Sequence, residues 1–250
     1  MSTALLYQRP VALSRDAHRH LRLVPGKASF SYASRTNCAP LACSEFASAA
    51  TEYPIVFSAD AKDERLPVAL LGIRESENLF VSAHGAWQGG YIPAFVRRYP
   101  FLLAAREGPE DFTVCVDEAY AAFASGADGE PLFLSDGAEA PALRQAIEFL
   151  DNYHTELKRT KAFVERLKAL DLLIPRVVHM TSAHGAKFTL QGFAVVDEKR
   201  LETLDERLLG ELMRTGYLRC IYAHLLSLGN VARLSGRLEA RLANETASAA

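Results

Sequence analysis

Two adjacent arginines, Arg97 and Arg98, lie in the stretch of this chain that is richest in aromatic residues. A guanidinium group pairs with a planar oxyanion through two parallel hydrogen bonds, so the pair is suited to hold a carboxylate or a phosphate. The alternative is that one arginine stacks on a ring and pairs with an internal acid while the other faces solvent. Aromatic walls and glycines beside a guanidinium favour a small acidic or aromatic ligand. The candidate ligand-binding residues are His84, Trp87, Tyr91, Arg97, Arg98 and Tyr99.

A second pair of reactive groups, Asp117 and Glu118, closes an apolar run. Carboxyl groups at the end of a buried strand are suited to proton transfer. Adjacent residues of a strand point to opposite faces, however, so these two cannot act as a facing pair. We therefore expect a helix cap, or an ion pair with Arg97 or Arg98.

The seven histidines do not show the spacing of a metal site. His154 and Glu156 are two positions apart in a helical region, where their side chains diverge by roughly 200°. His224 falls on the apolar stripe of the last helical region, which favours a hydrogen-bonded core histidine. We expect no metal and no cofactor. The open alternative is that the fold brings together His84, Asp117 and a C-terminal histidine, either His184 or His224.

Charge and composition exclude several classes of function. The chain has 250 residues with 28 basic and 30 acidic side chains, and its net charge of −2 does not indicate a nucleic-acid or anionic-membrane partner. No apolar run reaches the roughly 18 residues of a membrane-spanning helix. Nucleophile elbows, phosphate-binding loops and Cys-x-x-Cys motifs are missing. Four scattered cysteines and no secretory charge pattern lead us to expect a cytoplasmic protein.

The aromatic stretch from His84 to Phe101 has to be positioned by ordered elements. Its glycines allow a tight loop, and Pro93 presets a helix of about two turns that Pro100 ends. Before it, short apolar runs with turn-rich spacers predict an antiparallel meander. The expected elements are short strands at 20–24 and 28–32, a helix over 45–52 capped by Ser44, and meander strands at 55–57, 67–73 and 78–82.

Beyond the stretch, helical periodicity replaces the strands. A strand at 111–116 and a short run at 131–134 precede one long helix, or two packed end to end, that begins at Pro141. A hairpin of 176–180 with 187–196 follows, and then a helical region over 205–242 that Gly216 and Gly229 divide. The pattern predicts an α+β fold, an antiparallel β-sheet covered by helices, with long C-terminal helices.

A pentapeptide occurs twice, from Ser82 to Ala86 and from Ser182 to Ala186, each time directly after an apolar run. The residues that follow the two copies differ at once. We therefore expect two equivalent hairpin turns rather than a duplicated domain.

The segment from Trp87 to Phe101 reads Trp-x-x-x-Tyr-Ile-Pro-Ala-Phe-Val-Arg-Arg-Tyr-Pro-Phe and resembles the signature of the SapC family of bacterial proteins. The runs 52–57, 67–73 and 192–197 are similar to that family as well, so the resemblance covers most of residues 40–240. A peptide-transporter permease shares the name, but the lack of spanning helices excludes that protein.

The resemblance implies little about activity. The family takes its name from an association with a paracrystalline surface layer, which makes a cell-surface association an implication of the family alone. Its members are often encoded beside outer-membrane receptors and halogenase-like enzymes, which are candidate partners. It supplies no catalytic residues that can be carried over to this chain.

We expect a binding or accessory protein with a small acidic or aromatic ligand near Trp87 to Phe101. The first alternative is a metal-dependent, oxygenase-like enzyme that acts with halogenase-like neighbours. The second is a surface-layer structural protein. The expected organisation is an irregular basic arm over 1–43, one SapC-like α+β domain over 44–243 and a disordered tail over 244–250.

Overall fold

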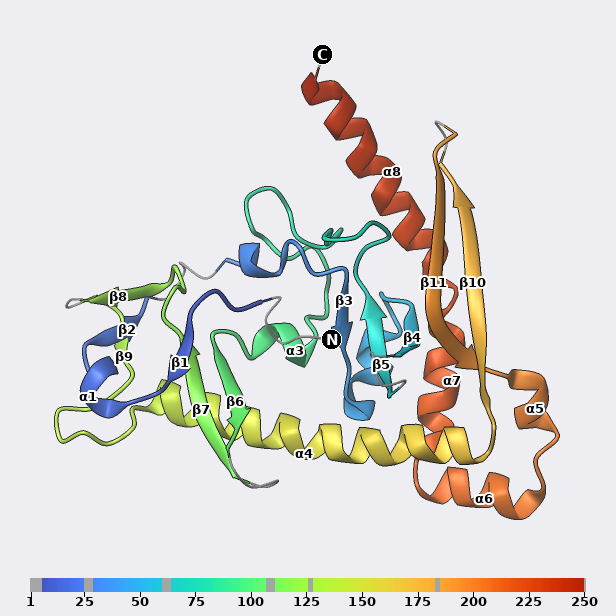
Figure 1. Cartoon of the computed structure of the whole chain (residues 1–250), viewed down its shortest axis with the longest axis horizontal. Coiled ribbons are helices and arrows are strands. Elements are labelled where there is room, and N and C mark those ends of the chain that lie inside the picture. The colour runs from blue at the N-terminus through green and yellow to red at the C-terminus, as the bar shows by residue number, and fades with distance from the viewer. Residues whose placement is uncertain are drawn as a thin grey trace.

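The computed structural model describes residues 6–24, 29–59, 64–106, 111–125, 128–182 and 185–249. The described residues form three antiparallel sheets and a set of helices, with one long helix running beneath two of the sheets (Figure 1). The predicted α+β class, with antiparallel sheets and long C-terminal helices, is confirmed.

The largest sheet has five strands in the order β10-β11-β4-β5-β3. Their bounds are β3 Cys38–Pro40, β4 Ile55–Ala59, β5 Arg65–Leu70, β10 Leu173–Thr181 and β11 Lys187–Val196. The predicted strand at 78–82 is wrong, because only an isolated bridge between Val81 and Trp87 occurs there. The side chain of Asn78 donates to Ala33 O and accepts from Phe80 N, which gives the backbone a turn instead of a ladder.

Two smaller sheets are built around the N-terminal part of the chain. One has the order β1-β7-β6, and the other has the order β8-β2-β9. Their bounds are β1 Pro10–Ala12, β2 Leu21–Leu23, β6 Phe101–Ala105, β7 Phe112–Asp117, β8 Phe123–Ser125 and β9 Glu130–Pro131. The predicted strands at 20–24 and 111–116 correspond to β2 and β7, whereas the run 131–134 contributes only one residue to a strand.

The first 43 residues contain more structure than the expected irregular arm. They include β1, β2, β3, a short helix α1 (Arg15–His18) and a 3-10 turn, η2 (Ser31–Ala33). Leu6 and Tyr7 are buried in the larger core. The strand expected at 28–32 is wrong at residues 31–32, which belong to η2. Ala28 lies outside the described residues. These segments are too short for an alternation of apolar and polar residues to be visible in the sequence.

Helix α4 (Pro141–Ala169) is one continuous helix, in agreement with the first of the two predicted forms. Its first half packs Leu143 and Leu150 with Phe101 and the smaller core. Its second half packs Phe163 and neighbouring apolar residues into the larger core around the five-stranded sheet. The helix therefore connects two hydrophobic cores, and its middle lies between them.

Four helices follow the β10–β11 hairpin, and α7 packs against the sheet through β11 and β4. Their bounds are α5 Glu198–Glu202, α6 Glu206–Arg214, α7 Tyr217–Ser227 and α8 Asn230–Ala249. Gly216, with a φ of 77°, separates α6 from α7, and Gly229 precedes α8, as predicted. Helix α5 was not predicted. The tail expected at 244–250 differs from the structure, because α8 continues through residues 244–249.

The repeated pentapeptide forms two turns with the same hydrogen bonds. Ser82 N donates to Ala86 O at 2.9 Å, and Ser182 N donates to Ala186 O at 2.7 Å. In both turns the serine hydroxyl also accepts from the alanine N–H at 3.0 Å. The prediction of two equivalent turns is confirmed, and the hydroxyl contact explains why both copies begin with serine.

Candidate functional site

The first half of the aromatic segment is a packed loop centred on Trp87. Its indole Nε1 donates to the Tyr53 hydroxyl and to Tyr91 O, both at 3.2 Å. Its ring lies 5.7 Å from that of Phe30 and 6.3 Å from that of Phe80, measured between centroids. The Tyr53 hydroxyl donates to Tyr91 O. The indole N–H therefore has its partners inside the protein.

Two carboxylates hold the same loop from the segment before β4, where η3 (Cys43–Glu45) leads into α2 (Phe46–Ala49). Glu52 Oε1 accepts from Gly90 N at 2.6 Å and from Tyr91 N at 3.1 Å. Glu45 Oε1 accepts from the Tyr91 hydroxyl at 2.8 Å and from Ala94 N at 2.7 Å. Burial and the neighbouring Glu45 carboxylate raise the pKa of Tyr91. These contacts bind the loop tightly to the body of the protein.

The structure corrects the predicted cap of this region and gives a reason for one of its glycines. Ser44 does not cap the helix, because it lies inside η3, whose N-cap is Ala42; Glu45 Oε2 accepts from Ala42 N at 2.8 Å. Gly89 allows the loop to approach its neighbours closely, since a Cβ atom there would lie 2.5 Å from Glu52 Oε2 and 2.8 Å from the Tyr53 hydroxyl.

The second half of the segment holds the arginine pair. Pro93 is the N-cap of α3 (Ala94–Arg97), which is shorter than the predicted two turns. Arg97 is exposed, donates from Nε to Ile92 O at 2.9 Å and lies 5.1 Å from the Phe149 ring centre. Arg98 is half-buried and lies 4.4 Å from the centre of the Phe95 ring. Adjacent in sequence, the two guanidinium groups have different surroundings.

Arg98 has buried nitrogens without a partner. Within the described residues its enclosed Nε and Nη2 form no hydrogen bond, and neither does the hydroxyl of Tyr153, a residue that is 6% exposed. The guanidinium lies 5.8 Å from the Tyr153 ring centre and equally far from that of Tyr7. Burial raises the pKa of Tyr7 to about 12, and the Arg98 charge opposes that rise. The three unpartnered atoms thus come from two side chains in contact.

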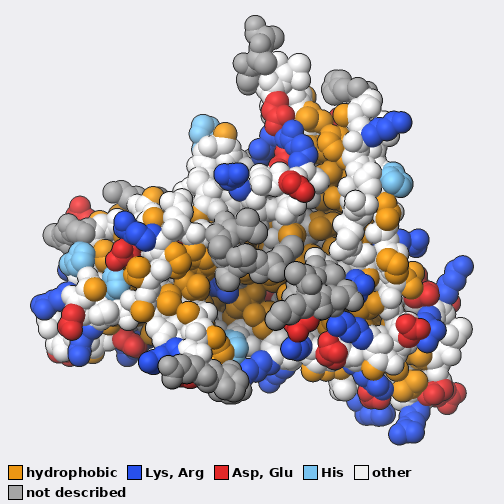
Figure 2. Space-filling model, in the orientation of Figure 1, with side chains coloured by type: hydrophobic (Ala, Val, Ile, Leu, Met, Phe, Trp, Pro, Cys, Tyr) orange, Lys and Arg blue, Asp and Glu red, His pale blue; other side chains and the backbone are white. Residues whose placement is uncertain are grey.

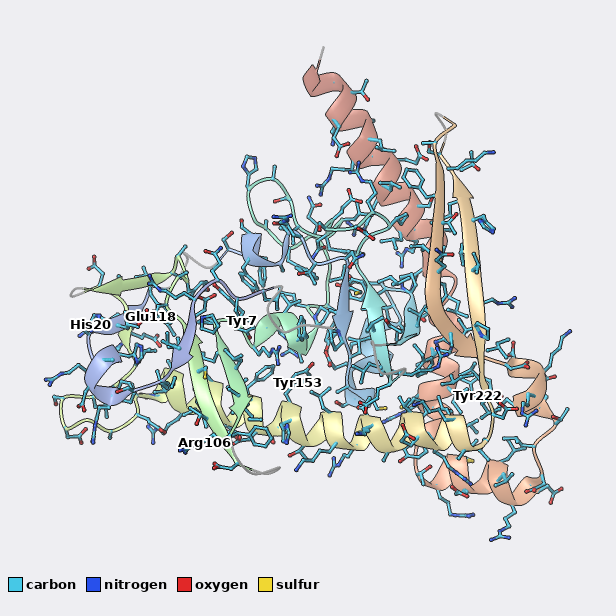
Figure 3. All side chains as sticks on the ribbon, in the orientation of Figure 1. Tyr7, His20, Arg106, Glu118, Tyr153 and Tyr222 are labelled. Atoms are coloured by element: carbon cyan, nitrogen blue, oxygen red, sulfur yellow. The ribbon has the colours of Figure 1, made fainter. Side chains whose placement is uncertain are left out.

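A cavity of about 360 Å³ adjoins these atoms, lined by α3, by α4 and by residues of β3 and β5. Arg98 and Tyr153 are among its lining residues, and Leu41, Phe95 and Leu157 supply apolar walls. Figure 3 shows Tyr153 rising from α4 toward the region of Tyr7. In Figure 2 hydrophobic side chains gather in the hollow above α4. The described lining contains Arg98, Lys158 and Lys161 but no acidic residue.

The acid pair forms contacts other than those expected. Asp117 is fully buried and accepts from Gln8 N at 2.8 Å, from Arg9 N at 3.0 Å and from the Tyr99 hydroxyl at 3.1 Å. Glu118 pairs with Arg9 at 3.1 Å. The expected ion pair with Arg97 or Arg98 is wrong, because Asp117 binds the backbone of Gln8 and Arg9, just before β1, and Glu118 pairs with Arg9. Tyr99 is buried here, stacked 3.8 Å from the Tyr32 ring.

The candidate histidines do not come together within the described residues. His84 is exposed in the first pentapeptide turn, and His184 lies outside the described residues. His224 is fully buried, with Nδ1 donating to Ile55 O at 2.8 Å and Nε2 accepting from Val196 N at 3.0 Å. Burial lowers its pKa to about 4, and the hydrogen bond to Ile55 opposes that shift. The interpretation of His224 as a hydrogen-bonded core residue is confirmed.

No group of three or more His, Cys, Asp or Glu side chains in the described part of the chain is placed to hold a metal ion. Within the same residues, no helix is both long and apolar enough to cross a membrane.

The SapC family model matches residues 13–234, a range that contains the aromatic segment and every residue of the cavity. The chain belongs to the SapC family. The resemblance given by the aromatic signature is confirmed. No curated protein and no solved structure matches this SapC-family chain.

The family signature points to only part of the cavity. It contains Phe95 and Arg98, whereas Tyr153 and Lys161 come from α4 and were not candidates. The only sequence signal for Tyr153 is a polar group on the apolar stripe that includes Leu150 and Leu157. Of the six predicted ligand-binding residues, Arg98 alone lines the cavity.

Proposed function

We propose that this protein binds a small organic anion, a carboxylate joined to an apolar or aromatic body, in the cavity between α3 and α4. The observation that carries the proposal is the unpartnered edge of Arg98. Nε and Nη2 lie on one edge of the guanidinium plane, and a carboxylate meets that edge with two parallel hydrogen bonds. The apolar walls contributed by Leu41, Phe95 and Leu157 suit the body of the ligand.

The cost of burying donors without acceptors also favours a carboxylate ligand in this cavity. A buried donor without an acceptor costs about 1 to 3 kcal/mol, and proteins tolerate few such groups away from binding sites. A carboxylate supplies acceptors for both Arg98 nitrogens and for the Tyr153 hydroxyl. Cationic side chains and no acidic ones among the described lining residues also favour an anion over a cation or a neutral ligand.

The other predicted functions have less support. A metal-dependent enzyme would need ligands that the described residues do not bring together. We therefore propose that the protein is a cytoplasmic accessory protein that binds its ligand without transforming it. Recovery of the native protein in the cell envelope would favour the surface-layer alternative over this one.

The test is a titration with matched ligands. Heptanoate and benzoate should raise the melting temperature and bind in calorimetry, while heptanamide, which keeps the chain but lacks the charge, should bind at least about tenfold more weakly. If neither acid binds, or if heptanamide binds as well as heptanoate, the proposal is wrong.

The two arginines provide a matched pair of variants. Arg98→Met should abolish heptanoate binding, whereas Arg97→Met should leave it unchanged because Arg97 is exposed and already donates to Ile92 O. Equal losses in both variants would mean that general positive charge, and not the Arg98 edge, attracts the acid.

A further inference from the structure

We infer that the ligand carries two anionic groups, one at each end of an apolar spacer, as in an α,ω-dicarboxylate. The inference rests on the proposed function and adds a second contact, at Lys161. It follows from the positions of cationic groups along the cavity rather than from the unpartnered atoms at its Arg98 end.

The cavity extends along α4. Its lining includes Tyr153, Leu157 and Lys161, which follow one another at intervals of four residues on one face of the helix. At 1.5 Å per residue, Tyr153 and Lys161 are about 12 Å apart along the axis. Arg98 lies at the Tyr153 end, with its guanidinium 5.8 Å from that ring centre. A cation therefore stands at each end of the same cavity.

Apolar side chains line much of the region between the two cations, although His154, Lys158 and Thr160 of α4 also border it. Leu157 lies halfway between Tyr153 and Lys161 on α4, and Leu41 and Phe95 line the cavity from other elements. A polar or charged centre in the ligand would lose its hydration against the side chains of Leu41, Phe95 and Leu157. A methylene or aromatic spacer fits this region.

The two ends differ in exposure. Arg98 is half-buried with enclosed nitrogens, whereas Lys161 is exposed. A monocarboxylate on Arg98 would leave its apolar end beside the Lys161 ammonium. A second carboxylate would pair with that ammonium, and the pair would be weaker and more sensitive to salt than the one at Arg98.

The experiment compares heptanedioate with heptanoate, which have the same chain length and differ in the second carboxylate. Calorimetry at low ionic strength should give about threefold tighter binding of the diacid, the size expected for one exposed ion pair. Added salt should reduce this preference, because the Lys161 pair is screened more than the contact at Arg98.

Two lysine variants on α4 locate the effect. Lys161→Met should remove the preference for heptanedioate, so that the two acids bind this variant with equal affinity. Lys168→Met is the matched control, because Lys168 lies on the same helix outside the cavity and pairs with Glu165 at 3.2 Å. The preference should persist in that variant.

The outcomes separate this inference from the proposed function. Equal affinities for the two acids in the unaltered protein would overturn the second contact and leave the proposed function standing. A preference that survives Lys161→Met would also overturn it. Absence of binding by both acids would contradict the proposed function itself.

Discussion

The two halves of the family signature use similar residues for different purposes. In the loop around Trp87, the indole N–H and the Tyr91 hydroxyl have hydrogen-bond partners within the protein. Around Arg98, by contrast, Nε and Nη2 are buried without a partner among the residues that the structure describes. Aromatic residues surround both places, so aromatic content alone does not distinguish a packed loop from a binding surface.

The difference shows which polar groups can still form hydrogen bonds with a ligand after the chain has folded. A polar group that the fold has already satisfied gains little from a ligand, whereas an enclosed and unpartnered group gains a full hydrogen bond. Arg97 and Arg98 make the same point at adjacent positions, since one donates to Ile92 O and the other keeps a free edge. Substitutions in the packed loop around Trp87 should therefore affect stability, and substitutions at Arg98 should affect binding.

Trp87→Ala should have the largest effect on stability. Truncating this anchor removes ring contacts and an indole donor, so the free energy of unfolding should fall by roughly 3 to 5 kcal/mol in chemical denaturation. Gln88→Ala, at the exposed neighbouring position, is the control and should change little. An unchanged melting temperature together with lost heptanoate binding would make Trp87 a binding residue and would contradict its role as a packing anchor.

His224 is a second buried group whose hydrogen bonds are all made within the protein. Its folded pKa of about 4 lies below its ordinary value of 6.5, so the unfolded chain takes up a proton first as the pH falls. Stability should therefore decrease by about 3 kcal/mol between pH 6.5 and 4 on account of this group.

Denaturation curves across that pH range measure the effect. His224→Gln should lose this part of the pH dependence even if the variant is less stable overall. His84→Gln, in an exposed turn, should retain it. An identical pH dependence in all three proteins would show that His224 is not the group responsible.

Arg98→Met should change stability much less than the truncation of Trp87. Loss of its ring contacts is offset by removal of the two unpartnered nitrogens, so the free energy of unfolding should change by less than about 1 kcal/mol. Urea denaturation without ligand provides the measurement. A decrease in the free energy of unfolding as large as that of Trp87→Ala would show that Arg98 stabilises the fold and is not available to a ligand.

Arg97→Met should have the smallest effect. An exposed guanidinium over a ring contributes about 0.5 to 1 kcal/mol at most, so the melting temperature should fall by no more than about 4 °C for a domain of this size. Thermal denaturation decides this. A larger effect from Arg97 than from Arg98 would reverse the roles assigned to the two arginines.

Local patterns predicted the parts of the fold that depend on nearby residues. The hairpin turns at Ser82 and Ser182 are set by contacts within five residues, and Gly216 divides the C-terminal helices through its own backbone angle. The fold class followed from such elements. The strand expected at 78–82 failed because the side chain of Asn78 binds Ala33, a residue far away in the sequence.

The site could be predicted only in part for the same reason. Arg98 was a candidate because its type and its neighbours favour an oxyanion. Asp117, one of the two acids expected to pair with an arginine of this segment, accepts from Gln8 N and Arg9 N instead, and among the described residues Arg98 Nε and Nη2 have no partner. The opposite wall depends on α4 passing beneath the segment with Tyr153 turned toward it. Such distant pairings leave no local pattern in the sequence.

The central claim is tested most directly by a crystal structure of the protein with bound heptanoate. The account predicts a carboxylate with its oxygens about 2.7 to 3.2 Å from Arg98 Nε and Nη2, and within hydrogen-bond distance of the Tyr153 hydroxyl. Heptanoate bound elsewhere, or a cavity left empty at saturating acid, would contradict it.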